Sequence, residues 1–386
     1  MARLSDFFAL IRNGVNIKQG LDDSGYPITR IETISNRTVD RNKMGYAGIN
    51  DLSKYRDYIL QDGDILMSHI NSEKHLAKTA LYQKNDGEEV IHGMNLLLLR
   101  PNTDCVISKY AFYYFSSQSF LRQIPNITKK SVNQASFTVS ALKELSFPSV
   151  SLNDQLKIVG ILEKIDTLIE MRKQQLAKLD ELVKARFVEM FGDYDLSHIQ
   201  DEWKSISQIG KVVGGATPKT NVVEYWDGEY RWITPAELDS DSGYIYDSVR
   251  KLTKTGVESC SLQEMPVNTV ILSSRAPIGK VAIAGKTFYC NQGFKNIICN
   301  GEILPRYLYT VLLLNTEYLN SLGRGATFKE ISKSIVENIK IPVPSIELQK
   351  QFTTFVEQVD KSKVAVQKAL DETQTLFDSL MQQYFG

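Results

Sequence analysis

The chain carries one segment twice, and the second copy lies 194 residues after the first, which is the interval from Pro148 to Pro342. The two copies occupy residues 145–192 and 339–386 and align without a gap. A repeat period this long is not that of a solenoid. The sequence therefore predicts two half-molecules, each a globular domain followed by a long repeated segment, and a target that itself has two parts.

Each copy of the repeated segment is predicted to form a long helix. Ser151 and Ser345 follow short proline-containing stretches and are suited to cap a helix N-terminus. Apolar side chains then recur at alternating steps of three and four residues, which is the heptad pattern of a coiled coil. The seam consists of Leu162, Ile165, Ile169, Leu176, Leu179, Val183 and Met190 in the first copy, and of Val356, Val359, Val366, Leu370, Phe377, Leu380 and Tyr384 in the second. Its polar interruptions are Arg172, Arg186, Lys363 and Thr373.

The apolar seam of each helix needs a partner, and the other copy is the obvious one. A helix over residues 152–190 would be about 58 Å long at a rise of ~1.5 Å per residue. An antiparallel pair is favoured, because it gives the internal repeat pseudo-twofold symmetry. A parallel pair would require the intervening domain to carry the chain back along the whole helix. Two unrelated bundle helices of similar composition are the alternative, and the gapless register argues against them.

The expected fold class is α+β. Two similar α/β target recognition domains would be separated by two long helices that form an antiparallel coiled coil. The expected boundaries are a first domain at 1–144, a central helical region at 145–192, a second domain at 193–338 and a C-terminal helical region at 339–386. Related anchors at 62–68 and 268–274, set among unrelated loops, indicate a shared fold with different specificities.

The composition is that of an intracellular protein. No apolar run approaches the length of a membrane span, and no secretory signal is present. The four cysteines form no Cys-x-x-Cys pair, so they are expected to be reduced. We therefore expect a cytoplasmic protein without membrane contact.

Basic residues are concentrated in two stretches, although the net charge of the chain is zero. No acidic residue lies between Asp104 and Glu144, or between Glu264 and Glu302. A local basic patch can bind phosphate even in a neutral chain. A solvated charged face is the alternative. The basic residues are Lys109, Arg122, Lys129, Lys130 and Lys143 in the first stretch, and Arg275, Lys280, Lys286 and Lys295 in the second.

Four motifs of the second half, taken in order, resemble those of a known family. They are Gly215-Ala-Thr-Pro-Lys219, Val270-Ile-Leu-Ser-Ser-Arg-Ala-Pro-Ile-Gly279, Asn291-Gln-Gly293 and Gly325-Ala-Thr-Phe-Lys-Glu-Ile331. With the repeated helical segment, they make the chain similar over essentially its full length to the specificity subunits of Type I restriction–modification systems. The first half departs from the pattern, with Asn13-Gly-Val-Asn-Ile17 and Ser131-Val-Asn-Gln-Ala135 at two of these places.

The resemblance implies a DNA-recognition subunit of the prokaryotic cytoplasm that performs no chemistry itself. Its ligand would be double-stranded DNA with a bipartite target, and its partners two methyltransferase subunits and, in the full complex, restriction subunits. S-adenosylmethionine, and ATP with Mg²⁺ for restriction, would be bound by those partners, and this chain would hold no cofactor. Each target recognition domain would read one half-site. The paired helices would set the spacer and dock the methyltransferase subunits.

The residues themselves agree with the lack of an active site. No (Asn/Asp/Ser)-Pro-Pro-(Tyr/Phe) methyltransferase tetrapeptide is present. The segment Pro277-Ile-Gly-Lys280 lacks the hydroxyl residue that a phosphate-binding loop places next. His69 and His75 have no third ligand nearby, so surface or DNA-facing histidines are favoured over a metal site.

Each domain is expected to place side chains in the major groove, with lysines and arginines on the phosphate backbone. Arg275 is the favoured base contact, because arginine can bind guanine O6 and N7 with two hydrogen bonds. For any single candidate, the alternative is a solvated surface residue. The candidates are Lys43, Ser68, His69, Asn71, Lys74, Lys78, Lys129, Lys130, Asn133 and Gln134 in the first domain, and Thr217, Lys219, Ser273, Ser274, Arg275, Lys280, Gln292, Lys295, Arg324 and Lys329 in the second.

Three other functions remain open from the sequence. A stand-alone sequence-specific DNA-binding regulator would bind its site tightly without a methyltransferase. The specificity subunit of a related Type II-like restriction–modification enzyme would share the same architecture. A single-chain enzyme would methylate DNA with S-adenosylmethionine unaided.

Overall fold

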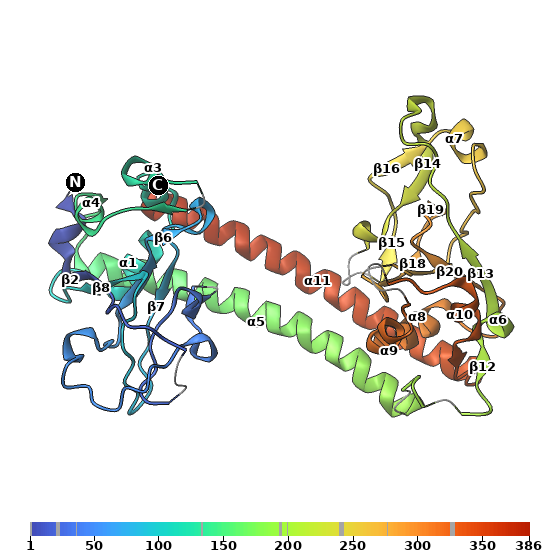
Figure 1. The fold of residues 1–386 in the computed structure, drawn as a ribbon, viewed down its shortest axis with the longest axis horizontal. Helices are drawn as coiled ribbons and strands as arrows, with labels where there is room; N and C mark the ends of the chain where they lie inside the picture. Colours follow the sequence, from blue (N-terminus) through green and yellow to red (C-terminus); the bar gives the residue numbers. More distant parts are fainter. Residues whose placement is uncertain are drawn as a thin grey trace. The chain divides into compact units, whose positions relative to one another are not determined.

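The computed structural model describes residues 2–20, 24–35, 37–132, 134–192, 195–198, 200–238, 243–275, 277–324 and 329–386. The chain forms two compact units. The first unit comprises Met1–Lys173 and Gln367–Gly386, and the second comprises Gln174–Val366. Each unit therefore combines one globular half of the chain with parts of both repeated segments (Figure 1).

The repeated segments form two continuous helices of equal length (Figure 1). α5 spans Leu152–Phe191 and α11 spans Ile346–Phe385, each with 40 residues. Both begin directly after the predicted capping serine: the Oγ atoms of Ser151 and Ser345 accept hydrogen bonds from backbone N–H groups three residues on, at 3.2 and 3.4 Å. The predicted helices are confirmed. No helix in the described ranges is both long enough and apolar enough to cross a lipid bilayer.

Within each unit, one end of α5 packs against the opposite end of α11. In the first unit, Leu162 near the start of α5 shares a buried core with Phe377 and Met381 near the end of α11. In the second unit, the ring of Phe187 near the end of α5 lies 5.4 Å from that of Phe352 near the start of α11. The two helices are therefore antiparallel, and the predicted α+β fold with an antiparallel coiled coil is confirmed.

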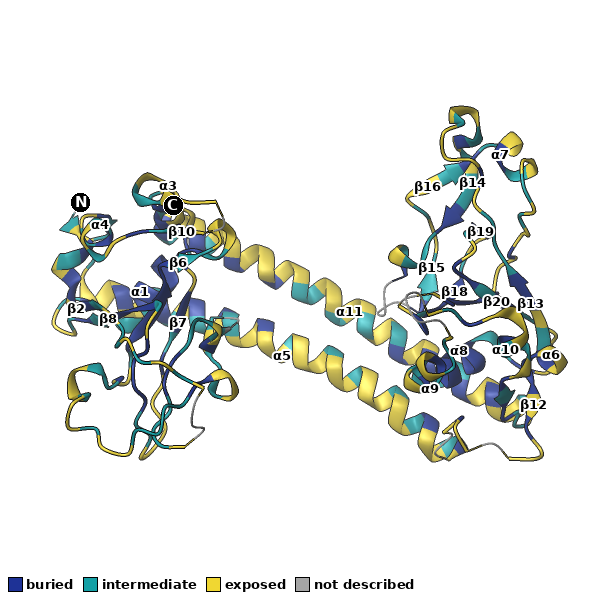
Figure 2. Cartoon of the chain, in the orientation of Figure 1, coloured by how far each residue is buried: buried dark blue, intermediate teal, exposed yellow. Residues whose placement is uncertain are grey.

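The predicted seam residues are all buried or half-buried (Figure 2). The buried ones are Leu162, Ile165, Ile169, Val356, Val359 and Phe377, and the others are half-buried, including Leu176 and Leu370 near the middle of the helices. Two polar interruptions of the seam find partners on the other helix, because Arg172 donates to the carbonyl of Ala369 and Lys363 pairs with Asp180. Aromatic and apolar residues outside the predicted seam are also buried: Phe187, Phe191, Phe352, Met381 and Phe385.

A four-stranded antiparallel sheet, in the order β2-β8-β5-β7, forms the centre of the first unit. Its central strand β5 is buried at every residue, which explains why this strand reads as a run without alternation. Tyr110 of α1 lies in the same core as the start of α5. The elements are β1 (Ala2–Arg3), η1 (Leu4–Phe7), β2 (Phe8–Asn13), η2 (Ile31–Thr33), β3 (Ile34–Ser35), β4 (Thr38–Val39), η3 (Arg41–Lys43), η4 (Arg56–Tyr58), β5 (Ile65–Ser68), β6 (Ile70–Asn71), η5 (Glu73–His75), β7 (Thr79–Leu81), β8 (Leu96–Pro101), α1 (Ser108–Tyr114), α2 (Gln118–Leu121), α3 (Ile124–Ile127), β9 (Lys129–Lys130), β10 (Ala135–Ser136), α4 (Val139–Lys143) and β11 (Ser146–Phe147).

A five-stranded sheet, in the order β13-β20-β17-β18-β15, forms the centre of the second unit. A separate three-stranded sheet, β16-β14-β19, carries Trp226 and Trp232, whose rings meet edge to face at 5.1 Å. The elements are β12 (Lys204–Ser205), α6 (Ile206–Ile209), β13 (Gly210–Gly214), η6 (Val223–Tyr225), β14 (Trp226–Ile233), η7 (Pro235–Glu237), β15 (Tyr244–Ile245), β16 (Arg250–Leu252), α7 (Lys254–Glu258), β17 (Val270–Leu272), β18 (Val281–Ala284), β19 (Tyr289–Cys290), β20 (Lys295–Cys299), α8 (Pro305–Leu314), α9 (Thr316–Ser321), α10 (Lys333–Asn338) and β21 (Lys340–Ile341).

The central sheets of the two units share one strand order, in which β2, β8, β5 and β7 correspond to β13, β20, β17 and β18. In both units a strand at the start of the globular half pairs with a strand just before a long helix, Ala2 with Phe147 and Lys204 with Ile341. The two halves therefore have a common scaffold. The predicted domain boundaries stay a prediction, because the compact units divide both long helices.

Candidate nucleic-acid interface

In each unit, a loop after the central buried strand carries several of the predicted DNA contacts. Ser68 ends β5, and its Oγ donates to the carbonyl of His75 at 2.5 Å and accepts from the N–H of Lys78 at 3.1 Å. Ser273 follows β17 and makes the same pair of hydrogen bonds within its own loop, at 2.8 and 2.9 Å. Both serines are buried. Their hydroxyls hold the loops in shape, and this geometry does not favour the direct DNA contact that the sequence suggested.

Beyond this loop, three short strands of the first unit form what we call the outer ladder. β10 lies between β6 and β9, so that Ser136 pairs with Ile70 on one side and with Lys129 on the other. The ladder thereby brings the acid-free stretch beside the loop that follows β5. The predicted contacts on or next to it are Asn71, Lys129, Lys130 and Gln134, while Asn133 lies outside the described residues.

A cleft of about 710 Å³ opens beside this ladder. It brings together four of the predicted contacts and adds Arg30, Glu32 and His75, which the sequence did not single out as contacts. The basic lining residues outnumber the one carboxylate, so the cleft suits a negatively charged ligand. The lining residues are Arg30, Ile31, Glu32, Ile34, Lys43, Ser68, Asn71, His75 and Lys78.

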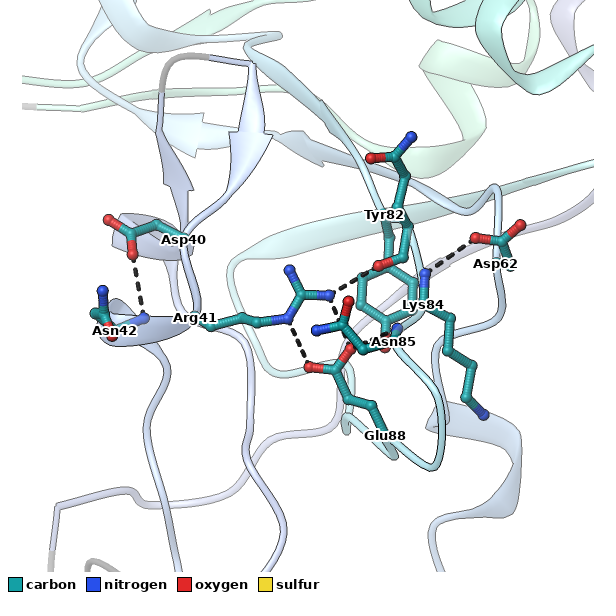
Figure 3. Close-up of polar contacts among 9 residues, drawn as sticks. Asp40, Arg41, Asn42, Asp62, Tyr82, Lys84, Asn85 and Glu88 are labelled. Atoms are coloured by element: carbon teal, nitrogen blue, oxygen red, sulfur yellow. Dashed lines mark hydrogen bonds and ion pairs between the residues drawn. The ribbon is translucent and has the colours of Figure 1, made fainter.

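An ion pair away from the cleft fixes the short helix that carries Lys43 (Figure 3). Arg41 of η3 donates from Nε and Nη2 to the two carboxylate oxygens of Glu88, at 2.7 and 2.8 Å. Tyr82 also donates to Glu88, at 3.1 Å. The Arg41 hydrogen bond is the main cause that lowers the pKa of Glu88 to about 2. The pair is therefore charged at neutral pH and holds η3, with Lys43 exposed at its end.

His69 is less suited to a DNA contact than the sequence suggested. Its side chain is buried against Phe137, with ring centroids 6.3 Å apart, and burial lowers the pKa of its imidazole. A buried neutral ring fits a core position. Lys74, later in the same loop, is exposed.

In the second unit, the isolated bridges of Glu330 with Arg275 and with Arg324 form the corresponding outer ladder, which carries a charged network. Glu330 pairs through its backbone with Arg275 and with Arg324, as Ser136 does with its neighbours in the first unit. The Glu330 side chain accepts from Arg275 Nε at 3.0 Å and from Lys295 Nζ at 3.3 Å. Lys295 Nζ also donates to Ser274 Oγ at 3.2 Å. The sequence singled out Arg275, Lys295 and Ser274 as candidate contacts but not Glu330, although Glu330 lies in the motif that ends at residue 331.

The other predicted contacts of the second unit are exposed, except for Lys280, whose ammonium is used inside the protein. Thr217 and Gln292 are exposed and lie together, with Oγ1 donating to Oε1 at 2.6 Å. Lys280 instead donates to the carbonyl of Leu238 at 3.0 Å, so its ammonium holds a loop of the protein. The remaining predicted contacts, all exposed, are Lys219, Arg324 and Lys329.

A groove runs between the long helices and the globular half in each unit, with a volume of about 540 Å³ in the first and about 400 Å³ in the second. Several residues at equivalent positions line both, among them Asp166 in the first and Asp360 in the second, although the ion pairs differ in their acidic partner. In the first, Lys109 of α1 pairs with Glu163 of α5. In the second, Arg306 of α8 pairs with Asp360 of α11 at 2.6 Å. The internal repeat thus provides two similar grooves on one chain.

Comparison with known proteins identifies a family that matches both halves of the chain. The family model for the Type I restriction modification DNA specificity domain matches residues 1–181 and 200–373. A protein of Methanocaldococcus jannaschii, provisionally described as the specificity subunit of the type I restriction enzyme MjaX, is 32% identical to this chain. That match covers 95% of this chain and 89% of the relative.

Solved structures share the fold at low sequence identity. A chain from a structure on complex assembly and conformational transition of the type I R-M system aligns with a TM-score of 0.60 and 15% identity, over 100% of this chain and 96% of its own. The S subunit of a Type-I restriction-modification system from M. genitalium aligns with a TM-score of 0.55 and 17% identity, over 100% of this chain and 95% of its own. Given the family match along both halves and the relative that covers nearly the whole chain, this protein belongs to the family of Type I restriction–modification DNA specificity subunits.

Proposed function

We propose that this chain is the non-catalytic specificity subunit of a Type I restriction–modification complex in the prokaryotic cytoplasm, and that each unit reads one half of a bipartite double-stranded DNA target. One observation carries the proposal beyond family membership. The two outer ladders occupy the same place on a common scaffold but present different side chains, Ile70 and Ser136 in one and Arg275 and Glu330 in the other. A shared scaffold with different groups at one site suits two different sequences.

The paired helices are proposed to set the distance between the half-sites and to dock two methyltransferase subunits. The grooves beside the helices support this stoichiometry, because one lies at the equivalent place in each unit. Restriction subunits would join the full complex. S-adenosylmethionine, and ATP with Mg²⁺, would act in these partners. Within the described ranges, no group of three or more His, Cys, Asp or Glu side chains is arranged to hold a metal ion.

Exchange of residues 1–144 for the equivalent part of a relative tests the proposal. The chimaera and the parent, each in complex with the methyltransferase subunits, would select their sites from a random double-stranded DNA library. We expect a bipartite motif in which only one half changes. The reciprocal exchange of residues 193–338 is the matched control and should change the other half. A contiguous motif, or a change in both halves from one exchange, would count against independent reading.

The same preparation separates the alternatives. A stand-alone regulator would bind its site with equal affinity when the methyltransferase is absent. A single-chain enzyme would transfer methyl groups from S-adenosylmethionine to DNA without a partner. A Type II-like system would cleave its target without separate restriction subunits.

A further inference from the structure

The charged network of the second outer ladder is not needed to close the ladder. In the first unit, the positions of Arg275 and Glu330 are occupied by Ile70 and Ser136, and the same antiparallel pairing forms. The next backbone hydrogen bond is also shared. Phe137 N–H donates to the carbonyl of His69 at 3.1 Å, and in the second unit Ile331 N–H donates to the carbonyl of Ser274 at 2.9 Å. A purely structural role therefore does not explain the charges.

Lys295 is likewise a replacement for an apolar residue. Ser68 pairs across the sheet with Leu96, and the next residue is Leu97. Its counterpart Ser273 pairs with Phe294, and the next residue is Lys295. Leu97 and Lys295 therefore occupy equivalent positions. Leu97 is buried, and the Lys295 side chain is only 13% exposed. Burying an ammonium group is unfavourable unless it is paired. The carboxylate of Glu330 and the hydroxyl of Ser274 provide that pairing.

The network fixes Arg275 through one nitrogen only. Its Nε donates to Glu330 Oε2, while within the described residues neither terminal nitrogen of the guanidinium has a hydrogen-bond partner. The Arg275 side chain is 47% exposed. Lys295 holds the other oxygen of the carboxylate, so Glu330 is anchored from both sides. Burial alone would raise the pKa of Glu330, but the hydrogen bonds from Arg275 and Lys295 outweigh it and lower that pKa, so the carboxylate stays ionised at neutral pH.

We infer that Glu330 is a positioning residue, which orients Arg275 so that its two terminal nitrogens read one guanine of the second half-site. The inference rests on the proposed function. A bidentate contact to guanine O6 and N7 requires the planar fork to be held at a fixed angle. Binding through Nε leaves both terminal nitrogens available and restricts a long side chain before DNA arrives, which reduces the entropy lost on binding. Two cations and one carboxylate leave a net positive charge, which suits contact with DNA.

The test compares site selection by the chain in complex with its methyltransferase subunits. Arg275→Ala should lose discrimination at one base position by roughly 5- to 150-fold. Glu330→Gln should lose discrimination at that same position and leave the rest of the motif unchanged. Because Glu330 acts through Arg275, the double variant should lose no more than Arg275→Ala alone. Glu302→Gln, which removes an exposed ion pair with Lys204 in the same unit, is the matched control and should leave the motif intact.

A second variant covers the case in which Glu330→Gln fails to fold because Lys295 is left unpaired. Combining Lys295→Leu with Glu330→Ser installs the residues that the first unit uses, Leu97 and Ser136, and keeps Arg275. This variant should fold and still lose discrimination at the Arg275 position. A uniform loss of affinity for all sequences, an effect at another position, or full additivity with Arg275→Ala would overturn the inference. A wild-type complex without any sequence preference would instead contradict the proposed function.

Discussion

Gln155 and Gln349 make the same three hydrogen bonds in two different units. Each side chain is fully buried near the start of a long helix. Each Oε1 accepts from a backbone N–H of the segment before a short helix, and each Nε2 donates to two carbonyls. The partners of Gln155 are Ile107 N at 2.9 Å and the carbonyls of Cys105 and Val150, both at 2.9 Å; those of Gln349 are Leu304 N at 2.7 Å and the carbonyls of Glu302 at 3.1 Å and Pro344 at 2.9 Å. The repeat is therefore preserved at the level of single atoms.

This equivalence predicts equal stability losses from two distant substitutions. Gln155→Leu and Gln349→Leu each leave one N–H and two carbonyls without their partner, and each should lower the free energy of unfolding by about 2–5 kcal/mol. Urea unfolding of the full chain measures the loss. Gln175→Leu, at an exposed position of α5, is the control and should change stability little. A large loss from only one of the buried glutamines would contradict equal roles.

Because His92 is buried, we predict that the first unit loses stability in mild acid. Burial is the main cause that lowers the pKa of His92 to about 3, whereas an unfolded histidine titrates near ~6.5. Below that pH the unfolded chain binds a proton that the folded chain excludes, so this contribution to stability is present above pH ~6.5 and is lost as the pH falls. Between pH 7 and pH 5 the loss from His92 should be about 2 kcal/mol.

Denaturant unfolding at both pH values checks this prediction. His92→Gln should lose less stability than the parent over that interval, although His69, whose pKa burial also lowers, still contributes. His198→Gln at an exposed position is the control and should follow the parent. Identical pH dependence in the parent and in His92→Gln would show that the ring does not titrate in this way.

The exposed lysines of the first outer ladder should contribute phosphate contacts that are independent of sequence. Replacing Lys129 and Lys130 with alanine should weaken binding similarly for all sites and reduce the salt dependence, log Kd against log salt, by roughly one to two units. Lys130 pairs with the exposed Glu73 at 2.7 Å, so its share should be the smaller. Alanine at Lys361 and Lys368, exposed on α11, is the control. A change in the preferred bases would instead make these lysines base contacts.

The long helices could be predicted because their signals are local and repeated. Two copies of one heptad pattern give the length of the helices and their pairing, and the internal repeat favours the antiparallel direction. The pattern missed Phe187 and Phe352, which lie beside the seam. Phe187 also packs on Tyr307 of the globular half, at 5.7 Å between ring centroids. A heptad pattern describes only the contact between two helices. At their ends the helices also pack against the globular half, so they bury a wider face there.

The site was harder to predict because its partners are far apart in the chain. Glu330 is 55 residues from Arg275, and only the ladder brings them together. Two small polar residues show the opposite case. Ser68 ends a buried strand and Ser273 follows one, which suggested an interface position, yet the hydroxyl of each is used inside its own loop. Whether such a hydroxyl faces DNA or the backbone depends on the return path of the loop, which no local pattern encodes.

Shortening both helices should shorten the gap between the half-sites. Residues 174–180 of α5 and 362–368 of α11 are the segments to delete, because this removes Asp180 and Lys363 together and keeps Arg172 with its acceptor Ala369. The loss of one heptad from each helix keeps the seam in phase. Seven residues correspond to about 10 Å of helix, or about three base pairs at ~3.4 Å each.

Selection from a library with variable spacers measures the effect of this deletion. The preferred gap should fall by about three base pairs while both half-site sequences stay the same. Deleting the heptad from α5 alone is the matched control: it puts the two seams out of register and should reduce binding at every spacer. An unchanged gap in the paired deletion would show that the helices do not set the distance, and their two grooves would then be better explained as docking surfaces for the methyltransferase subunits alone.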